Sequence, residues 1–568
     1  MPRRSRSLFR FSLRRMASGG VFAPLRNRTF AAIWTAALFS NFGIVIQSVG
    51  AAWLMTSIAP TPDYVALVQA AMSAPMMLFA LISGAMADTI DRRRLMLAAQ
   101  ILVLVASLAV ALANWAGIIT PWTLLFFTFL IGVSTSLYAP AWQSSVSDIV
   151  ARDKVPAAIG LQAVNFNLAR SAGPAVGGAI IALAGVTTAF FFNTVSVIGL
   201  IVVLWTWRYQ RPAQALAPER LDRAVVSGVR YVALSPALRV AMLRAALFGL
   251  SASAIQSLMP LVARDVLGGG PFTFGALLGA FGVGAMAGGF GSVRLRSRLG
   301  PQGLAIWGSA AFGASSIVLG LSPWVALSML ALFVAGACWT LSLSTFNITV
   351  QTSAPRWVTG RALAAYQMSV FGGLALGSVV SGQIARSAGT EEALIFAGVA
   401  MLVGLMAARR YSLRQVDAAN LNPHTLPLNN LPALDLEPRA GPIIVTLEYR
   451  VPRENAREFV EAANRLARLR RRDGASDWVL IQDLDDPERW IERFQSPTWL
   501  DHLRRQSRMT GGTHAASELV RTFHRGKDGA PPIVHRYIER PEGSDSYLAD
   551  REVTGESDED RQISRSQI

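Results

Sequence analysis

Long apolar runs separated by short polar turns dominate the chain from residue 29 to residue 409. A helix needs about 20 apolar residues to cross the hydrocarbon core of a bilayer, and every run reaches that length. The pattern therefore predicts an all-α polytopic membrane protein with 12 transmembrane helices. The runs lie at about 29–57, 64–87, 95–117, 121–142, 158–183, 186–207, 237–263, 272–292, 302–321, 323–349, 361–386 and 390–409.

These runs form two related sets of six. Gly84-Ala-Met-Ala recurs two hundred positions later as Gly284-Ala-Met-Ala, and Arg94-Leu95 recurs as Arg294-Leu295. A second cluster repeats at the same offset: Gly160, Gly173, Ala175 and Gly177 return as Gly360, Gly373, Ala375 and Gly377. Duplicated bundles of this kind are typical of transporters. We expect two parallel six-helix repeats, at 29–207 and 237–410, joined by a loop at 208–236.

Arginine and lysine gather at alternate turns. The turns around Arg92–Arg94, Arg152 with Lys154, 208–239 and Arg294–Arg298 are basic, and all of them fall on one side of the predicted bundle. Because basic loops stay in the cytoplasm, both termini are expected there, in a plasma (bacterial inner) membrane. Residues 1–28 then form a cytoplasmic Arg-rich tail, and Met16 is an alternative start. The portion from Asp222 to Val232 suits a short helix on the membrane surface.

After residue 410 the pattern changes. Residues 411–441 form a Pro-rich linker. Alternating strands are expected at 443–451, 478–482, 489–495 and 533–539, and helices at 454–472, 497–508 and 511–525. In the first of these helices, Phe459, Ala463, Leu466 and Leu469 share one face. The order strand-helix-strand-strand-helix-strand predicts an α+β ferredoxin-like soluble domain at 442–540. Residues 541–568 are acidic and polar and are expected to be disordered.

The turn after the second run resembles the signature of the major facilitator superfamily, Gly-x-x-x-Asp-Arg-x-Gly-Arg-Arg. Gly84, Asp88, Arg92 and Arg93 match, whereas Thr89 and Asp91 depart from it. Further stretches make residues 22–410 similar to the enterobactin-exporter-like branch, also called the transmembrane secretion effector family. The stretches are Leu25–Phe30, Ser40–Gly43, Pro140–Gln143 and Asn167–Gly178. Residues 443–540 resemble a dimeric domain of the antibiotic-biosynthesis-monooxygenase type.

The first resemblance implies a conformational latch. In the superfamily, the carboxylate that matches Asp88 docks against the N-terminus of helix 11, whose free N–H groups favour an anion. Here that N-terminus lies near residues 359–362, and Arg361 is a further partner. The latch would consist of Gly84, Asp88, Arg92, Arg93 and Arg361. The alternative is that Asp88 is a solvated charge that only marks topology. The repeat has Gly288 at this position and therefore no second carboxylate.

Polar side chains within the spans are candidates for a substrate path. Arg170 falls near mid-membrane, where a buried arginine is costly unless it faces a cavity or a partner. It is either a substrate or gating residue or an arginine capped at a helix interface. The amides in the spans either line the path or join helices. They are Asn41, Gln47, Gln143, Asn165, Gln256, Asn347, Gln351 and Gln367.

Other chemistries find little support. The chain has no Gly-x-x-x-x-Gly-Lys-Ser/Thr motif for ATP, and its net charge of +17 is explained mainly by topology rather than by nucleic acid. Cys338 stands alone in an apolar run and supports neither a disulfide nor redox chemistry. The histidines of the tail have no metal-site spacing. We expect no enzyme activity, catalytic residue, metal or cofactor. The tail histidines considered are His502, His514, His524 and His535.

The first hypothesis is therefore a secondary transporter that exports a small amphipathic molecule by alternating access. The siderophore class comes from the resemblance, and drug-like compounds are equally compatible. The expected partners are the lipid bilayer, a small-molecule substrate and a second copy through the C-terminal domain. One alternative is a carrier fused to a monooxygenase-like domain that modifies its cargo. Another is a membrane-anchored scaffold without transport.

Overall fold

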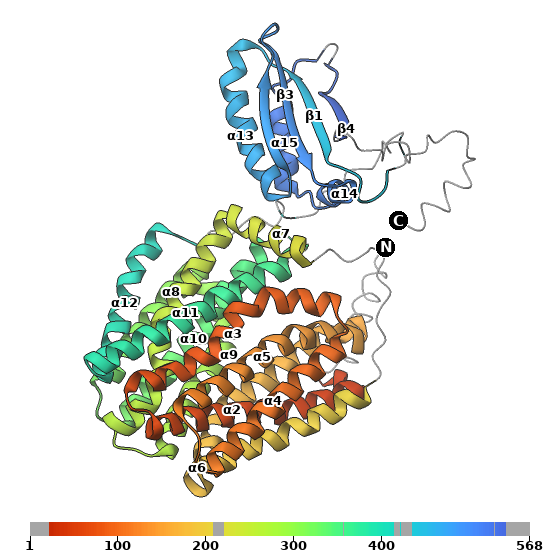
Figure 1. The fold of residues 1–568 in the computed structure, drawn as a ribbon. Coiled ribbons are helices and arrows are strands. Elements are labelled where there is room, and N and C mark those ends of the chain that lie inside the picture. The colour runs from red at the N-terminus through yellow and green to blue at the C-terminus, as the bar shows by residue number, and fades with distance from the viewer. Residues whose placement is uncertain are drawn as a thin grey trace, which may run out of the picture.

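The computed structural model describes residues 22–207, 221–355, 357–413, 421, 434, 436–526 and 529–540. The first half of the bundle comprises α2 (Arg28–Ile58), α3 (Pro62–Thr89), α4 (Arg92–Trp115), α5 (Pro121–Ile149) and α6 (Val155–Thr206). The second half comprises α8 (Pro236–Leu261), α9 (Pro271–Leu321), α10 (Val325–Ser353), α11 (Thr359–Ser387) and α12 (Thr390–Arg410). Along the chain, α7 (Leu221–Leu234) joins the two halves, and its bounds lie within two residues of those predicted for the short surface helix. Figure 1 shows the helices as one bundle with a separate domain at its end.

Nine helices among the described residues are long and apolar enough to cross a membrane. Two of them, α6 with 52 residues and α9 with 51, would be roughly 75 Å long if straight, well beyond a bilayer. Each contains a glycine with positive φ, Gly185 at 82° and Gly300 at 65°, which turns the chain back. Both are therefore pairs of spans: 155–184 with 186–206, and 271–299 with 301–321. With α12, the twelve predicted spans are present.

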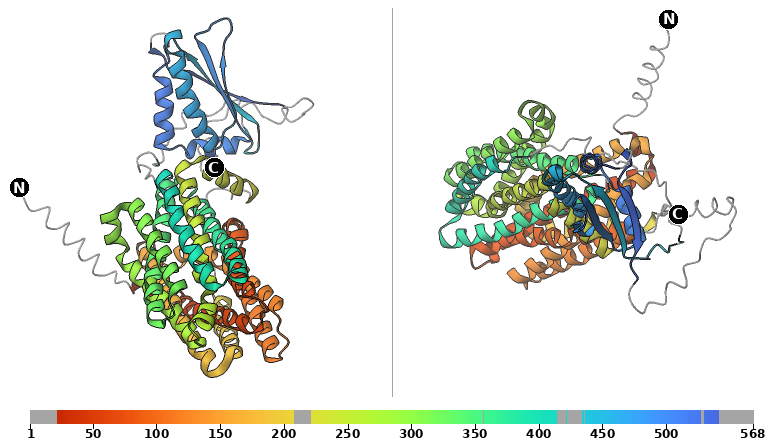
Figure 2. Two further views of the ribbon diagram at one scale, coloured as in Figure 1. Left: turned by 90° about the vertical axis from the view of Figure 1, so that its left-hand side faces the viewer. Right: turned by 90° about the horizontal axis from the view of Figure 1, so that it is seen from above.

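The two halves use matching contacts. In the first half, the first segment of α6 packs on α2, and in the second half α11 packs on α8. The repeated glycines explain this pairing, because Gly173 lies against Val45 and its equivalent Gly373 lies against the backbone of Ala246. Likewise α3 pairs with α5 as α9 pairs with α10. Across the halves, α3 meets α11 and the first segment of α6 meets α9. These equivalences confirm two six-helix repeats, which lie side by side in Figure 2.

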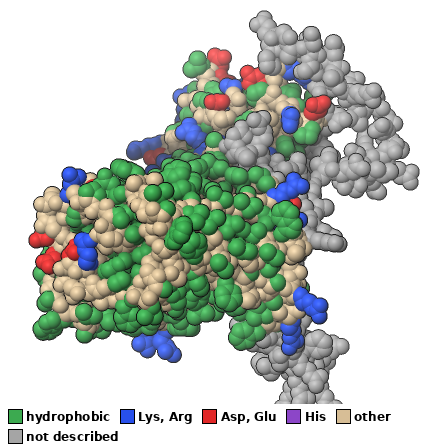
Figure 3. All heavy atoms as spheres, turned by 60° about the horizontal axis from the view of Figure 1, so that its bottom comes forward, with side chains coloured by type: hydrophobic (Ala, Val, Ile, Leu, Met, Phe, Trp, Pro, Cys, Tyr) green, Lys and Arg blue, Asp and Glu red, His purple; other side chains and the backbone are tan. Residues whose placement is uncertain are grey.

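Apolar side chains cover the outside of the bundle, with lysine and arginine at its edges (Figure 3). Leu183, Phe290 and Val293 are each more than three-quarters exposed. Such a surface is unsuited to water and suits lipid. The protein is thus a helical polytopic membrane protein. Below, the end that carries α7 and the turn between α3 and α4 is called the basic end.

The C-terminal domain contains β1 (Ile443–Arg450), α13 (Ala456–Arg472), β2 (Ser476–Gln482), β3 (Arg489–Ser496), α14 (Trp499–Ser507), α15 (Gly511–Arg521) and β4 (Ile533–Ile538). Its antiparallel sheet has the order β2-β3-β1-β4. This is the strand order of the predicted ferredoxin-like sandwich. On the helix-covered face, Tyr449, Phe459 and Phe494 are buried together in the domain's own core. Figure 2 shows the helices on one side of the sheet.

Several predicted segments fall outside the described residues: the tail up to residue 21 with Met16, the loop at 208–220, most of the linker at 411–441, and 541–568. Within the described part, most element boundaries lie within four residues of the predicted ones, but α5 and the first segment of α9 each continue seven residues past the predicted ends at 142 and 292. Asp91 lies in the turn before α4, where its Oδ1 accepts a hydrogen bond from the backbone N–H of Arg94 at 3.0 Å. It therefore caps the N-terminus of α4.

Candidate functional site

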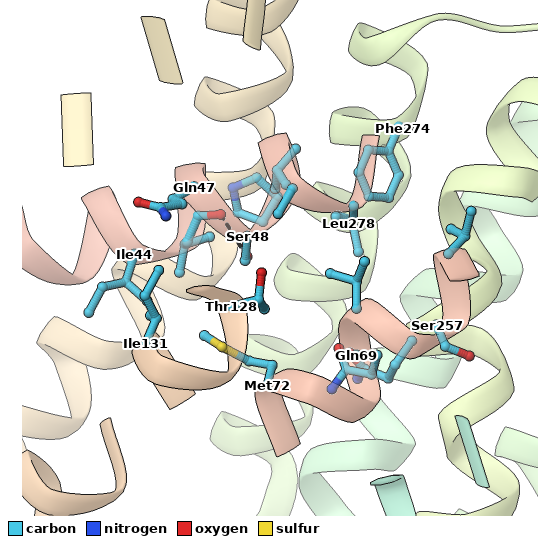
Figure 4. Close-up of a pocket in the computed structure, with 18 of the residues that line it drawn as sticks. Ile44, Gln47, Ser48, Gln69, Met72, Thr128, Ile131, Ser257, Phe274 and Leu278 are labelled. Carbon is cyan, nitrogen blue, oxygen red and sulfur yellow. Dashed lines mark hydrogen bonds between the residues drawn. The ribbon is translucent and has the colours of Figure 1, made fainter. Parts of the chain in front are cut away.

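A cavity of about 200 Å³ lies between the two halves. One side of its wall comes from α2, α3, α5 and α6, and the other from α8 and α9. Most lining side chains are apolar, such as Met72, Ile131, Phe274 and Leu278. Figure 4 shows Ser48, Thr128, Gln69 and Ser257 distributed around the same space. An apolar wall with a few separated hydrogen-bonding groups suits an amphipathic small molecule.

Arg170 contributes a cation to this wall. Its guanidinium carbon lies 5.9 Å from the ring centroid of Phe281 and 5.5 Å from that of Trp339. Both rings belong to the second half, on α9 and α10, whereas Arg170 belongs to the first. The neighbouring Ser171 Oγ donates to the carbonyl oxygen of Gly282 at 3.0 Å. Arg170 thus lies both beside the cavity and at the contact between the halves, where aromatic faces stabilise its charge.

The predicted amides fall into different places. Gln47 and Gln256 lie at the cavity wall. Asn41 Nδ2 donates to Asn165 Oδ1 at 2.8 Å, and Asn165 Nδ2 donates to the carbonyl oxygen of Trp34 at 2.8 Å, so this pair joins α2 to α6. The other four are not among the lining residues: Gln143 is exposed, Gln351 donates to Asn347 at 2.5 Å, and Gln367 is half-buried.

Several polar lining residues were missed by the sequence analysis, namely Ser48, Gln69, Thr128 and Ser257. Gln69 could have been found by the criterion applied to the other amides, because it too interrupts an apolar run. The three hydroxyls give no such signal. Serine and threonine commonly bond to the carbonyl four residues earlier in their own helix, as Thr128 does to Leu124 at 2.7 Å.

The turn between α3 and α4 is tied to the rest of the first half by two arginines. Arg92 Nη1 donates to Asp148 Oδ2 at 2.5 Å and to the carbonyl oxygen of Ser144 at 2.8 Å, both near the end of α5. Arg93 donates to the carbonyl oxygens of Leu204 and Trp205 at 2.8 and 2.5 Å. A helix end leaves such carbonyls without helical partners, and a cation suits them.

The side chain of Asp88 lies outside the described residues, so the predicted latch stays a prediction. The backbone still shows where position 88 lies along the length of α11. A methyl group built on Gly372 would lie 3.1 Å from Met77 Sδ, and one on Gly382 would lie 2.8 Å from Ala66 Cβ. Since α3 and α11 run antiparallel with equal rise, position 88 comes level with the first turn of α11. Arg361, in that turn, donates from Nη1 to Ser227 Oγ of α7 at 2.7 Å.

The C-terminal domain holds a buried charge network. Glu492 Oε2 accepts from Arg470 Nη2 and from the Tyr449 hydroxyl, each at 3.1 Å, and Glu492 Oε1 accepts from Trp478 Nε1 at 2.8 Å. Burial, with the Glu492 charge beside it, raises the pKa of Tyr449 well above its usual range. A carboxylate satisfied by three donors inside a closed core orders that core.

The tail histidines do not converge. His502 is buried and stacked on Trp499, and burial together with Arg505 and Arg536 lowers its pKa to about 3. His524 Nδ1 accepts from the backbone N–H of Arg450 at 2.8 Å, whereas His535 stacks on Tyr537. Among the residues that the structure describes, no group of three or more His, Cys, Asp or Glu side chains is placed to hold a metal ion.

Comparisons with known proteins agree with this architecture. The multidrug efflux pump Tap of Mycolicibacterium fortuitum is 22% identical over 396 residues, covering 68% of this chain and 96% of the pump. An MFS-type transporter of Bacillus subtilis, YfiS, is 24% identical over 358 residues, covering 61% of this chain and 84% of that protein.

Solved structures show the fold. An auto-inhibited POT family peptide transporter matches with a TM-score of 0.57 and 15% identity, over 70% of this chain and 99% of that one. A bacterial homologue of the human lysosomal transporter Spinster, inward-facing and unoccupied, matches with a TM-score of 0.54 and 16% identity, over 68% and 96%. The model of the transmembrane secretion effector family matches residues 19–542. The chain therefore belongs to this family of major facilitator transporters.

Proposed function

We propose that the protein exports amphipathic organic molecules, of the drug-like or siderophore class, from the cytoplasm by alternating access. The cavity between the halves carries this proposal. Its wall comes from both repeats, so rocking of one repeat against the other would expose it to each side in turn. The name of the Tap relatives, multidrug efflux pump, supports an export direction.

The wall also indicates which substrates to test. Apolar side chains would bind the body of a molecule, and Gln47, Gln69 and Gln256 would bond its polar groups. Arg170 adds a positive charge beside the cavity that can pair with a carboxylate or another acceptor. An acidic or acceptor-rich amphiphile would compete with the rings of Phe281 and Trp339 for the guanidinium. Binding would then loosen a contact between the halves.

Reconstituted vesicles test this proposal. Purified protein would be challenged with a panel of amphipathic acids, catecholates and neutral dyes, and transport compared between wild type and Arg170→Gln. We expect at least about tenfold slower transport of the acceptor-bearing compounds, the loss of roughly one charge-assisted hydrogen bond. Neutral dyes should change less. Arg239→Gln, which removes an exposed arginine of α8, is the matched control.

Failure of wild type to move any compound of the panel would contradict export of this class. Equal transport by wild type and Arg170→Gln for every compound would remove Arg170 from the path. The monodispersity of the variant in detergent checks that the bundle still folds.

The orientation and the latch belong to the same proposal. With the basic end in the cytoplasm of a bacterial inner membrane, both termini are cytoplasmic. Asp88 then faces the N-terminus of α11 when that side is closed, and the contact breaks when it opens. The level of position 88 beside α11 supports this pairing.

The C-terminal domain adds a partner surface. The sheet face opposite its helices carries exposed apolar side chains, including Val479, Ile481, Ile533 and Tyr537 at 42–54% exposure. We propose that a second copy covers this face, as the resemblance to dimeric monooxygenase-type domains implies. Light scattering of the detergent-solubilised protein should give a dimer, and Ile533→Glu with Tyr537→Glu should give a monomer.

A further inference from the structure

The helix between the two halves lies beneath the C-terminal domain. α7 packs against α3 of the first half, against α8 and α11 of the second half, and against α13 of the C-terminal domain. Figure 1 shows it between the bundle and the domain. One short helix therefore contacts all three parts of the chain, at the end where rocking of the halves must change their separation.

Two arginines of the domain stack on two aromatic rings of the bundle. The guanidinium carbon of Arg472, at the end of α13, lies 4.9 Å from the ring centroid of Tyr231 on α7. That of Arg508, which follows α14, lies 4.4 Å from the ring centroid of Trp357, just before α11. Tyr231 and Trp357 meet edge to face, with centroids 5.4 Å apart and planes at 84°. These four side chains form a continuous row, called here the arginine–aromatic row.

The row is held firmly at the domain side. Arg472 Nε donates to Asp473 Oδ1 at 2.9 Å, and Asp473 Oδ2 accepts from Thr513 Oγ1 at 2.8 Å. The Tyr231 ring is 1% exposed, and burial raises its pKa to about 12. Arg472 is thus positioned by its own domain to cover a ring that belongs to the bundle.

At the bundle side, α7 is fixed to α11. Arg361 donates to Ser227, and its side chain lies so close to Gly228 that a methyl group built there would come within 2.8 Å of Arg361 Cβ. A displacement of α11 therefore displaces α7 as well. Both carry rings of the arginine–aromatic row, so the C-terminal domain contacts the moving elements directly.

We propose that the C-terminal domain is a clamp on the basic end of the carrier. While docked through the arginine–aromatic row, it holds α7 and the N-terminus of α11 in the arrangement seen here. It thereby biases the equilibrium between the two access states. Contacts present in only one state shift the populations by their full differential free energy. Release of the domain frees the basic end to rearrange. The clamp rests on the family's alternating access and on no particular substrate.

Spin-label distances in the full-length protein test the clamp without a substrate. Cys338 is the only cysteine, so a Cys338→Ser background accepts labels at introduced sites. Leu484→Cys with Ser297→Cys reports docking of the domain. Ile90→Cys with Ser297→Cys reports the separation of the two halves at the basic end. Leu484, Ile90 and Ser297 are exposed. The substitutions to be compared are Arg472→Gln with Arg508→Gln.

We expect the double variant to broaden the distribution of distances between labels at 484 and 297. The distances between labels at 90 and 297 should fall into two populations, one for each access state, and their ratio should change by about five- to thirtyfold, the effect of two cation–π contacts. Trp357→Leu removes a ring from the bundle side and should act in the same direction. Arg468→Gln with Arg525→Gln removes the same charge from exposed positions of the domain and should leave both distances unchanged.

Unchanged docking in the double variant and in Trp357→Leu would show that the row does not hold the domain. If the domain is released but the distances between labels at 90 and 297 do not change, docking has no effect on the access state. Either result overturns the clamp and leaves the export proposal to its own transport assay.

Discussion

Residues 84–95 and 284–295 share a tetrapeptide and an Arg-Leu pair, but the two repeats use them differently. A methyl group built on Gly84 would meet nothing within 4 Å, whereas one on Gly284 would overlap the carbonyl oxygen of Phe333. In the second half, α9 thus approaches α10 at backbone contact. In the first half, α3 and α5 approach closely at a different level, where Gly132 of α5 lies against Pro75 of α3.

The charges differ in the same way. Arg92 and Arg93 tie the first turn to the ends of α5 and α6, and Asp88 precedes them. At position 288 the second repeat has glycine, which packs against the backbone of Ala337. Duplication has therefore kept the helix arrangement, while at this turn the first repeat has the carboxylate and the second has glycines in backbone contact with α10. The proposed charge-based latch would therefore use a carboxylate of the first repeat alone.

The largest expected effect comes from matched glycine substitutions. Gly284→Ala should force α9 and α10 apart and destabilise the bundle by roughly 1–3 kcal/mol, because overlap with backbone cannot be relieved by a rotamer change. Gly84→Ala should be neutral or slightly stabilising, since alanine favours helix. Thermal unfolding in detergent measures both. Equal melting temperatures for the two variants would show that the two repeats do not differ in helix packing at these glycines.

Asp88→Asn is next. It keeps the shape of the side chain but removes the charge proposed to face the N-terminus of α11. A carboxylate at a helix terminus contributes roughly 0.3–2 kcal/mol, which changes a population ratio by up to about thirtyfold. Opening of the basic end should become more favourable and transport should fall, while insertion persists. Labelling of introduced cysteines from each side measures the shift.

Asp91→Asn is the matched control, because asparagine can still accept the capping hydrogen bond from Arg94. Equal labelling of wild type, Asp88→Asn and Asp91→Asn would reduce Asp88 to a marker of topology. Gly288→Asp would not restore symmetry, because its side chain has no room against Ala337.

The smallest effect concerns Arg93. Arg93→Gln removes two hydrogen bonds to the end of α6 and should lower the stability of the first half by about 1–2 kcal/mol, with little change in access state. Its equivalent in the repeat is Val293, which is exposed, so Val293→Gln serves as the control. If Arg93→Gln altered access as strongly as Asp88→Asn, the turn would work as one unit and the separate roles would be wrong.

Much of the fold follows from local pattern. Run lengths and the repeat predicted twelve spans, and alternation predicted the elements of the C-terminal domain, because both signals depend on neighbouring residues. The breaks at Gly185 and Gly300 were also near predicted boundaries. Asp91 shows the limit, since its capping role required the local backbone geometry.

The site was harder to predict. Arg170 was identified because a charge inside an apolar run is rare, but its stacking on Phe281 and Trp339 depends on how two halves pack. Asn41 and Asn165 carry the same signal as Gln47 and Gln256, yet they bond to each other instead of lining the cavity. The contact of Arg472 and Arg508 with the bundle joins segments with more than a hundred intervening residues, and no local pattern encodes it.

The central claim is that the cavity between the halves is exposed to each side of the membrane in turn. Cysteines placed at Gln69 and Thr128 in a Cys338→Ser background, in sealed vesicles of known orientation, would be treated with a membrane-impermeant maleimide from one side or the other. Both positions should react from either side, and Asp88→Asn should change the ratio of the two rates. Modification from one side alone at both positions, or from neither, would contradict alternating access through this cavity.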